Sequence, residues 1–348
     1  MTVKTEMLAA VLYGKEHLRI EPVAVPEVGA SDVLVRVKAA LTCGTDVKVF
    51  RRGYHARMIV PPAVFGHEWA GDIVAVGAAV EGFRPGQRVM AANSAPCWKC
   101  YYCRRGQENL CEDLLFNNGA YAEYIRIPGR IVERNMYELP PQVSYQDAAL
   151  AEPLACVLRA LEETGMQPGD DVAVVGLGPI GLMFVRLATT WGARVIALGR
   201  RRTQLERAEA LGAAELLLTP ELGDAVQAVR DLTGGRGADV AIEAVGKPQT
   251  WELSAHLVRR GGTVNFFGGC PSDTQVSLET SLLHYSEITC KASFHHTPAH
   301  IRKALELIAE GVFTAQDFVN REEPLTNLIG VLRYLMSHNG HLKTAIIP

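Results

Sequence analysis

The chain has 348 residues, of which 48% are hydrophobic and 21% charged, with a formal net charge of −3. This length allows about two domains with a sizeable buried core, and the nearly neutral charge, without a long basic block, argues against a nucleic-acid partner. No stretch approaches about 18 uninterrupted apolar residues, and the beginning MTVKTEMLAA lacks a basic segment followed by a long apolar one. We therefore expect a cytoplasmic protein without a membrane anchor.

The first candidate metal site combines a cysteine with a histidine and a glutamate further along the chain. Cys43 lies in LTCGTDVKVF, and the adjacent pair His67 and Glu68 lies in VFGHEWAGDIVAVG. A thiolate, an imidazole and a carboxylate that are far apart in sequence form the mixed ligand set of an open catalytic zinc site. Each residue alone also fits an ordinary role, because single cysteines are often buried as small hydrophobic residues and a His–Glu pair is often a surface contact.

Four of the eight cysteines lie in the segment APCWKCYYCRRGQENLCED. In a large cytosolic chain this crowding favours a metal over disulfides, because thiols stay reduced there. A spacing of two residues suits a tight loop around one tetrahedral zinc ion. An iron–sulfur cluster is the weaker alternative, because seven residues rather than about three precede the last cysteine and Glu112 rather than proline follows it; cysteines without metal are a further alternative. The expected ligands of a structural zinc are Cys97, Cys100, Cys103 and Cys111.

A carboxylate stands in the otherwise apolar run ALAEPLACVL. Burying Glu152 in this run is unfavourable unless the carboxylate is paired or bound to a metal. We therefore expect Glu152 to be the fourth ligand of the catalytic zinc or to contact a water molecule on that zinc. A structural ion pair is the alternative.

The middle of the chain carries a dinucleotide-binding pattern. In DVAVVGLGPIG a short β-branched strand leads into three glycines, and a helix-compatible run follows. The first glycine permits a tight turn, the second lets the backbone approach a pyrophosphate, and the third allows close helix–strand packing, while the helix N-terminus offers amide donors to the phosphates. Further strand candidates alternate with amphipathic helices, which predicts a doubly wound parallel sheet over about residues 166–294. The expected cofactor contacts are Gly176, Gly178, Pro179, Ile180, Gly181 and, in the strand candidate GGTVNFFGG, Gly268.

Three consecutive arginines follow the second strand candidate of this sheet, RVIALG. In NAD-binding versions of the fold, a carboxylate at the end of this strand hydrogen-bonds the adenosine ribose. Here Gly199 ends the strand, and Arg200 and Arg201 come next. Guanidinium groups can bind a 2′-phosphate bidentately, so we expect NADP rather than NAD, with contacts from Arg200 and Arg201 more than from Arg202. The alternative is three solvated arginines, which would lie unfavourably at the positive end of a helix dipole.

Together these motifs resemble the zinc-containing medium-chain dehydrogenase/reductase superfamily, and within it the polyol (sorbitol) and threonine dehydrogenase branch. The resemblance covers essentially the whole chain. It rests on Cys43, GHE at 66–68, the four-cysteine segment, GAYAEY at 119–124, AEP at 151–153 and GLGPIG at 176–181.

The resemblance implies an α/β chain with two domains. A GroES-like β-barrel catalytic domain would comprise residues 1–155 and 295–348 and would carry the structural zinc lobe at about residues 94–114. A Rossmann domain with a doubly wound parallel sheet would comprise residues 156–294. The resemblance further implies one catalytic and one structural zinc per chain, an active site in the cleft between the domains, and a homotetramer, with a homodimer as the alternative.

Further site residues follow from the resemblance. Thr45 matches a hydroxyl that hydrogen-bonds the substrate oxygen and starts a proton relay, with turn capping as the alternative, and Asp46 is expected to be structural. Lys48 replaces the histidine of the family pattern C-G-[ST]-D-x-H, so the chain departs from the usual relay. In SFHHTP, His295 takes the place of an arginine that polyol dehydrogenases carry. His295 is therefore expected either to adapt the site to a different substrate or to be structural.

We therefore expect a zinc-dependent oxidoreductase that transfers a hydride between NADP(H) and a secondary alcohol or polyol, or the corresponding ketone or aldehyde. Zinc would act as a Lewis acid on the oxygen of this small-molecule substrate, and the nicotinamide would exchange the hydride. The alternatives are an L-threonine dehydrogenase-like enzyme that uses NAD and a non-catalytic NADPH-binding sensor. The expected catalytic residues are Thr45, Lys48, Glu68, Glu152 and His295.

Three further cysteines, Cys156, Cys270 and Cys290, have apolar neighbours and are expected to be packed thiols. The run HIRKALELIAEGVF has helical apolar spacing and predicts an amphipathic helix on the core. EITCKASF is a strand candidate that could extend the sheet across a dimer.

Overall fold

The computed structural model describes residues 4–55, 58–221, 223–337 and 341–348, and these fall into two compact units. The first unit comprises Met1–Ala155 and His296–Pro348, and the second comprises Cys156–His295. Helix α4 (Ala151–Glu162) carries the chain from the first unit into the second. Within the described ranges, no helix is both long and apolar enough to cross a lipid bilayer.

The first unit is built mainly from antiparallel strands. Its largest sheet has the order β10-β6-β5-β3-β18-β17, with β9 also paired to β3. A smaller sheet has the order β2-β1-β4, and β7 pairs with β8 on either side of the cysteine-rich segment. The strands are β1 (Glu6–Gly14), β2 (His17–Ala24), β3 (Val33–Leu41), β4 (Ala63–Val64), β5 (Glu68–Val76), β6 (Arg88–Ala91), β7 (Ser94–Ala95), β8 (Leu115–Phe116), β9 (Tyr124–Ile127), β10 (Met136–Glu138), β17 (Val319–Pro324) and β18 (Lys343–Ile347).

The sequence of β3 explains its central position in the large sheet. Its residues VLVRVKAAL are almost all buried, and β5, β9 and β18 pair with it. Valine and other compact apolar residues pack well in a strand that is covered by its neighbours. The surrounding core cluster includes Val35, Phe50, Trp69 and Ile346.

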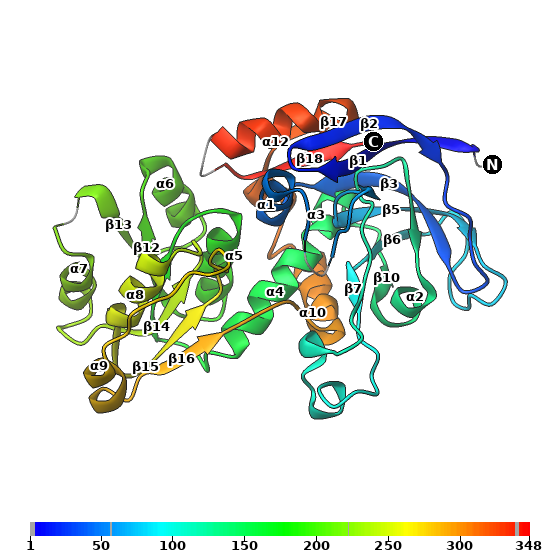
Figure 1. Ribbon diagram of the computed structural model, residues 1–348. Helices are drawn as coiled ribbons and strands as arrows, with labels where there is room; N and C mark the ends of the chain where they lie inside the picture. Colours follow the sequence, from blue (N-terminus) through cyan, green and yellow to red (C-terminus); the bar gives the residue numbers. More distant parts are fainter. Residues whose placement is uncertain (1–3, 56–57, 222, 338–340) are drawn as a thin grey trace. The chain divides into compact units, whose positions relative to one another are not determined.

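Strand β18, near the C-terminus, lies beside β3, so segments from both ends of the chain build one sheet (Figure 1). The pairing is antiparallel and places Ala345 opposite Leu41. Two residues before Ala345 is Lys343, and two residues after Leu41 is Cys43. The register therefore places Lys343 beside Cys43. For this reason Lys343 becomes part of the candidate site.

Helix α10 confirms the amphipathic helix predicted for residues 300–313, although it begins and ends slightly earlier. Its buried residues include Ile301, Ala304, Leu305 and Ile308, which lie three to four residues apart on one face. The helices of the first unit are α1 (Gly44–Arg52), α2 (Gly129–Asn135), α3 (Tyr145–Ala149), α10 (Pro298–Ala309), α11 (Ala315–Phe318) and α12 (Leu328–Ser337), with 3-10 turns η1 (Cys103–Arg105), η2 (Glu108–Leu110) and η4 (Leu325–Asn327).

The second unit contains a parallel six-stranded sheet in the order β13-β12-β11-β14-β15-β16, which confirms the predicted doubly wound architecture. The chain order reverses between β11 and β14, and ligands of such sheets bind at the carboxyl ends of the strands next to this reversal. The strands are β11 (Asp171–Val175), β12 (Arg194–Gly199), β13 (Glu215–Leu218), β14 (Ala238–Glu243), β15 (Val258–Phe266) and β16 (Thr289–Ala292).

Helices connect these strands, as right-handed parallel crossovers require. The central strand β11, DVAVV, is buried along its whole length, as is typical of a parallel strand covered on both faces. The core of the unit includes Val175, Ile196, Leu198 and Val264. The helices are α5 (Pro179–Thr190), α6 (Arg202–Ala210), α7 (Ala225–Leu232), α8 (Pro248–Leu257) and α9 (Thr280–Tyr285), with the 3-10 turn η3 (Thr219–Glu221).

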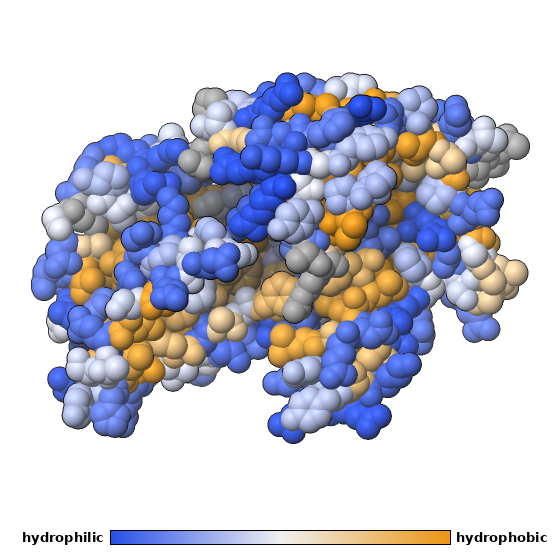
Figure 2. All heavy atoms as spheres, in the orientation of Figure 1, coloured by the Kyte–Doolittle hydropathy of each residue, from blue (hydrophilic) through white to orange (hydrophobic). Residues whose placement is uncertain are grey.

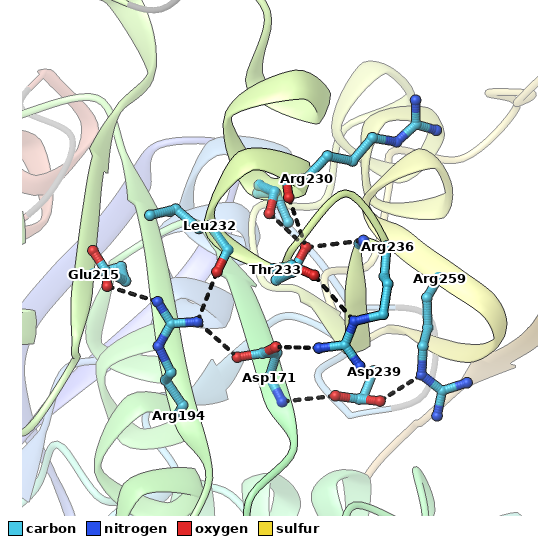
Figure 3. Close-up of polar contacts among 11 residues, drawn as sticks. Asp171, Arg194, Glu215, Arg230, Leu232, Thr233, Arg236, Asp239 and Arg259 are labelled. Atoms are coloured by element: carbon cyan, nitrogen blue, oxygen red, sulfur yellow. Dashed lines mark hydrogen bonds and ion pairs between the residues drawn. The ribbon is translucent and has the colours of Figure 1, made fainter.

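Charged side chains tie together the amino ends of neighbouring strands in this sheet (Figure 3). Arg194 donates to Asp171 Oδ1 at 3.0 Å and to Glu215 Oε1 at 2.7 Å. Asp239 accepts from Arg259 Nε at 2.5 Å and from the backbone N of Asp171 at 2.8 Å. This network lies at the edge of the sheet opposite the carboxyl ends, so it supports the unit and leaves the ligand-binding edge to other residues.

Candidate zinc centre and cofactor site

Cys43, His67 and Glu68 come together where β3 pairs with β5. Cys43 directly precedes α1, and Glu68, the first residue of β5, pairs with Leu41. One donor atom from each of the three lies within 4.8 Å of the others. His67 and Glu68 are buried and Cys43 is half-buried. Sulfur, nitrogen and carboxylate donors at such separations fit one zinc ion, so the structure brings together three of the predicted ligands.

Asp46 contacts two of these three residues. Its Oδ2 accepts a hydrogen bond from the backbone N of Cys43 at 3.0 Å, and its Oδ1 lies 3.1 Å from His67 Nδ1. Burial disfavours the imidazolium form, but the carboxylate outweighs burial and raises the pKa of His67 well above its ordinary value. Because Nδ1 faces Asp46, Nε2 is left for a metal. Asp46 is therefore more than the structural residue expected, since it caps α1 and also orients a candidate ligand.

Lys343 forms a buried ion pair with Glu68. Its Nζ lies 2.7 Å and 2.6 Å from the two carboxylate oxygens and donates to the carbonyl of Thr42 at 3.2 Å. Burial disfavours the ammonium, but the carboxylate outweighs burial and raises the pKa of Lys343. Burial also raises the pKa of the Glu68 carboxyl, and the Lys343 ammonium lowers it, so the ion pair offsets part of the cost of a buried carboxylate beside Cys43 and His67.

Glu152 lies on α4 and is not part of the three-donor group. Burial raises the pKa of its carboxyl to about 7. Its Oε1 lies 3.7 Å from Nε2 of the buried His296, and the same nitrogen lies 3.1 Å from Asn93 Oδ1. The structure thus places Glu152 beside His296, as the ion-pair alternative expects, and a role for Glu152 at the catalytic zinc stays a prediction.

The other predicted catalytic residues lie in three different settings. Thr45 is half-buried at the start of α1, and its backbone N donates to Cys43 Sγ at 3.4 Å. Lys48 is exposed on the same helix. His295 has a φ of +68°, its ring stacks on Phe294, and its carbonyl accepts from Arg159 at 3.0 Å. Catalytic roles for Thr45, Lys48 and His295 stay predictions.

Sequence reasoning missed several polar residues around the candidate zinc centre. Lys343 begins β18, whose sequence is KTAII, and a charged residue at the start of such a run is a signal that could have identified it. His296 directly follows the predicted His295, but nothing in the sequence shows which of the two is buried. Tyr121 lies in the GAYAEY motif that supports the resemblance, but the motif does not indicate its partner Asp46, and Asn93 lies in a loop whose partner is distant in sequence. The missed residues are Asn93, Tyr121, His296 and Lys343.

The four cysteines of the lobe converge as predicted for a closed metal site. Their sulfur atoms all lie within 4.8 Å of one another, with Sγ–Sγ separations of 4.0 Å for Cys97–Cys103 and 3.9 Å for Cys100–Cys111. Tetrahedral zinc with bonds of about 2.3 Å holds its sulfur ligands about 3.8 Å apart. All eight cysteines are free rather than disulfide-bonded. The geometry therefore fits zinc held by four thiolates, with no ligand position left for a substrate.

Replacing Cys97 with serine is expected to reduce stability or assembly rather than chemistry, because the lobe would lose a thiolate ligand. We expect Tm to fall by roughly 5–10 °C and one zinc per chain to be lost. Differential scanning calorimetry and metal analysis check both. Cys290→Ser is the control, because Cys290 lies exposed on β16, so the prediction that it is a packed thiol is wrong. Unchanged Tm and zinc content in the Cys97 variant would contradict the structural role.

The turn from β11 to α5 requires glycine at defined positions. Gly176 has a φ of +94°, and a Cβ there would lie 2.4 Å from Val245 Cγ2. A Cβ on Gly181 would lie 1.8 Å from the carbonyl oxygen of Gly176, so the third glycine permits close packing of α5 on the turn. Gly178 caps α5 with Pro179 as the next residue, and the space around a Cβ at Gly178 is open. The amides of the first turn after Pro179 have no partner within the helix and can face a phosphate.

Gly268 lies in the loop after β15 and packs against the loop after β14, at the same edge of the sheet. A Cβ at Gly268 would lie 2.3 Å from the backbone N of Gly246 and 2.6 Å from Glu243 Oε2. Glu243 is fully buried at the end of β14 and accepts hydrogen bonds from Gly246 N at 2.9 Å and Thr250 Oγ1 at 2.6 Å. These contacts organise the loops after β14 and β15 at the ligand-binding edge. Ile180, also predicted as a cofactor contact, is half-buried in the first turn of α5.

The three arginines follow the carboxyl end of β12. Arg200 and Arg201 precede α6, and all three arginines are exposed; Figure 2 shows a mainly hydrophilic surface in the region of α6. Arg202 donates to both carboxylate oxygens of Glu221 at 2.7 Å and 3.0 Å. Arg202 thus has a carboxylate partner on the surface, and the assignment of Arg200 and Arg201 as phosphate contacts stays a prediction.

Comparison with known proteins adds independent findings. Residues 29–140 match the alcohol dehydrogenase GroES-like domain, and residues 179–310 match the zinc-binding dehydrogenase family. The chain is 32% identical to sorbitol dehydrogenase from Bacillus subtilis over 100% of this chain and 99% of that protein. It is 36% identical to L-threonine 3-dehydrogenase from Bacillus licheniformis over 72% of this chain and 73% of that protein.

A solved structure extends the similarity to three dimensions. A zinc-binding dehydrogenase from Sinorhizobium meliloti 1021, bound to NADP, superposes with a TM-score of 0.90 at 31% identity and covers 99% of this chain and 100% of its own. Together with the GroES-like and Rossmann units, these similarities confirm the resemblance drawn from the sequence motifs. The chain belongs to the zinc-containing medium-chain dehydrogenase/reductase superfamily, in its branch of polyol and threonine dehydrogenases.

Proposed function

We propose that the protein is a zinc-dependent dehydrogenase that transfers a hydride between NADP(H) and a secondary alcohol or polyol, or the corresponding ketone or aldehyde. The observation that carries this proposal is the group of Cys43, His67 and Glu68, whose donor atoms lie within 4.8 Å of one another. A chain that bound the cofactor only as a sensor would have no need for an open mixed-ligand group in addition to the four-cysteine lobe.

In the proposed centre, Cys43, His67 and Glu68 would hold the zinc ion. Zinc bound there would supply Lewis acidity to the substrate oxygen. Asp46 fixes the ring of His67 through Nδ1, and Lys343 holds the carboxylate of Glu68 through both of its oxygens. The two partners orient the candidate ligands before any metal arrives, which reduces the cost of ordering them.

Residues near this centre would accept the proton of the substrate hydroxyl and pass it on. Thr45 lies two residues after Cys43, and we propose that its hydroxyl hydrogen-bonds the substrate oxygen. Glu152, whose pKa is raised to about 7 by burial, is suited to exchange a proton with water near neutral pH. Lys48 replaces the family histidine and lies exposed on α1, so it could take part only from the solvent side.

The proposed cofactor is NADP. Its support is the absence of an acid at the end of β12, where Gly199 is followed by Arg200 and Arg201. The solved relative from Sinorhizobium meliloti that binds NADP agrees with this choice. The diphosphate would lie at the start of α5, where the amides of Ile180 and Gly181 precede the first hydrogen bond within the helix, which Leu182 donates to Gly178.

The proposed substrate class is a polyol or another secondary alcohol, which follows the sorbitol dehydrogenase relative. Oxidation of L-threonine with NAD is a second candidate, favoured by the threonine dehydrogenase relative.

We also propose that the chain assembles as a homotetramer or homodimer.

A substrate panel tests this function. With polyols, simple secondary alcohols and L-threonine assayed with both cofactors, we expect kcat/KM for a polyol with NADP to exceed that for L-threonine by about tenfold or more. Metal analysis is expected to give two zinc ions per chain. Turnover of L-threonine with NAD as the best reaction would favour the second candidate. One zinc per chain and no turnover would contradict the enzymatic proposal.

A further inference from the structure

Tyr121 lies against the segment that carries two of the candidate zinc ligands. Its backbone N donates to the carbonyl of Phe65 at 2.9 Å, and the amides of Gly119 and Ala120 both donate to the carbonyl of Gly66, at 2.9 Å and 3.1 Å. Residues 119–121 thus follow the backbone that leads directly into His67. Tyr121 itself is completely buried.

The ring of Tyr121 occupies the space beside Gly66. A Cβ at Gly66 would lie 2.6 Å from Tyr121 Cδ2 and 2.8 Å from its Cγ, and Gly66 has a φ of +92°. The ring also packs against Phe65 with a centroid separation of 5.6 Å. Since Gly66 immediately precedes His67, the ring fixes the backbone from which this ligand projects.

The hydroxyl of Tyr121 reaches the other segment of the site. It lies 2.6 Å from Asp46 Oδ2 and 3.1 Å from the carbonyl oxygen of Leu41. Burial, followed by the charge of Asp46, raises the pKa of Tyr121 well above its ordinary value, so the phenol remains a donor. The same carboxylate accepts from the backbone of Cys43 and faces His67 Nδ1.

We infer that Tyr121 is a positioning residue for the zinc centre: its hydroxyl orients the Asp46 carboxylate, and through Asp46 it fixes the ring of His67 and the backbone of Cys43. The inference rests on the proposed function, because it takes Cys43, His67 and Glu68 as the zinc ligands. A buried carboxylate that loses one donor is free to turn toward its remaining partners, and His67 would then lose its fixed orientation.

Tyr121→Phe removes only the hydroxyl and keeps the ring against Phe65 and Gly66, so the fold is expected to survive. Full-length protein that retains zinc at the four-cysteine lobe is titrated with Zn²⁺ in competition with a chelator. We expect the affinity of the second site to fall by about tenfold, with unchanged far-UV circular dichroism and lobe zinc. The matched control is Tyr145→Phe, since the Tyr145 hydroxyl bonds to Asp72 Oδ1 at 2.5 Å, and neither residue belongs to the three-donor group.

The same substitution in an Asp46→Asn background separates positioning from a general structural effect. If Tyr121 acts through Asp46, Tyr121→Phe lowers the zinc affinity of the parent chain. In the Asp46→Asn variant, the same substitution should cause almost no further loss. Co²⁺ bound at the second site should also show shifted d–d absorption bands in Tyr121→Phe and unshifted bands in Tyr145→Phe.

Three results would overturn the inference. Wild-type zinc affinity with unshifted Co²⁺ bands in Tyr121→Phe would show that the hydroxyl does not position the centre. An equal loss in both backgrounds would assign Tyr121 a structural effect independent of Asp46. A parent chain that binds zinc only at the lobe would overturn the proposed function together with this inference, whereas the first two results would leave the proposed function intact.

Discussion

Replacing Cys43 with alanine is expected to lower kcat/KM by on the order of 10³-fold or more, because Lewis-acid stabilisation of the substrate oxygen would be lost with the metal. Cys43 supplies the only thiol of the three-donor group. Histidine and carboxylate donors alone would bind zinc more weakly, since the thiolate is the softest of the three ligands. The fold should remain, because Cys43 caps α1 through Sγ and contributes little to the apolar core.

Three measurements on the Cys43 variant separate loss of the centre from loss of the fold. The zinc content should fall from two ions per chain to one. The far-UV circular dichroism spectrum and the NADPH affinity measured by fluorescence titration should stay as in the parent protein. Cys290→Ala is the matched control, because this thiol lies exposed on β16 and outside the candidate metal groups of the described residues. Retained turnover in the Cys43 variant would remove zinc catalysis from the proposed function.

The cofactor-binding fold could be predicted from the sequence because its signals are local. Strands β11, β12, β13 and β14 each contain a short apolar run, and the glycines from Gly176 to Gly181 fix the turn that follows β11. The first and last residues of the strands were harder to predict than the strands themselves. Strand β15 begins at Val258, three residues before the predicted run GGTVNFFGG, because Val258 pairs with Ala238 ahead of a register shift. Pairing of this kind depends on a neighbouring strand and leaves no mark in the run itself.

The candidate zinc centre could be predicted only in part. Cys43 and the pair His67–Glu68 could be predicted as ligands because residue types and their spacing are visible in the sequence. Lys343 lies 275 positions after Glu68 and reaches it only through the antiparallel pairing of β18 with β3. No rule based on spacing connects residues so far apart, so the ion-pair partner of Glu68 could be identified only from the register of the sheet.

The role of Asp46 shows a second limit of sequence reasoning. Its position three residues after Cys43 identifies a helix cap, and the structure shows that cap. The contact with His67 and the hydroxyl of Tyr121 come from two other segments, so a correct local assignment missed the wider function of the residue. Polar groups that orient metal ligands are defined by tertiary packing, which is why the ligands themselves were easier to predict than their partners.

Replacing Arg200 with aspartate is expected to lower the ratio of kcat/KM for NADP to that for NAD by about 10- to 100-fold, because a hydrogen bond to a charged group contributes roughly 1.5–3 kcal/mol. The new carboxylate would repel a 2′-phosphate and could accept a hydrogen bond from the ribose of NAD. The position suits such a change. Arg200 follows the last residue of β12 and is exposed, so aspartate can be accommodated without disturbing the core.

Two comparisons make the Arg200 result specific. Arg201→Ala should reduce the same ratio, because Arg201 lies at the start of α6 and is the second candidate for the phosphate. Arg202→Ala should leave the ratio nearly unchanged, since Glu221 already engages the Arg202 guanidinium through both carboxylate oxygens. If all three variants kept the parent ratio, the arginines would be solvent-exposed residues without a role in cofactor choice. A large effect from Arg202 alone would instead mean that the phosphate displaces Glu221 and that the preference is set at the start of α6 rather than at the end of β12.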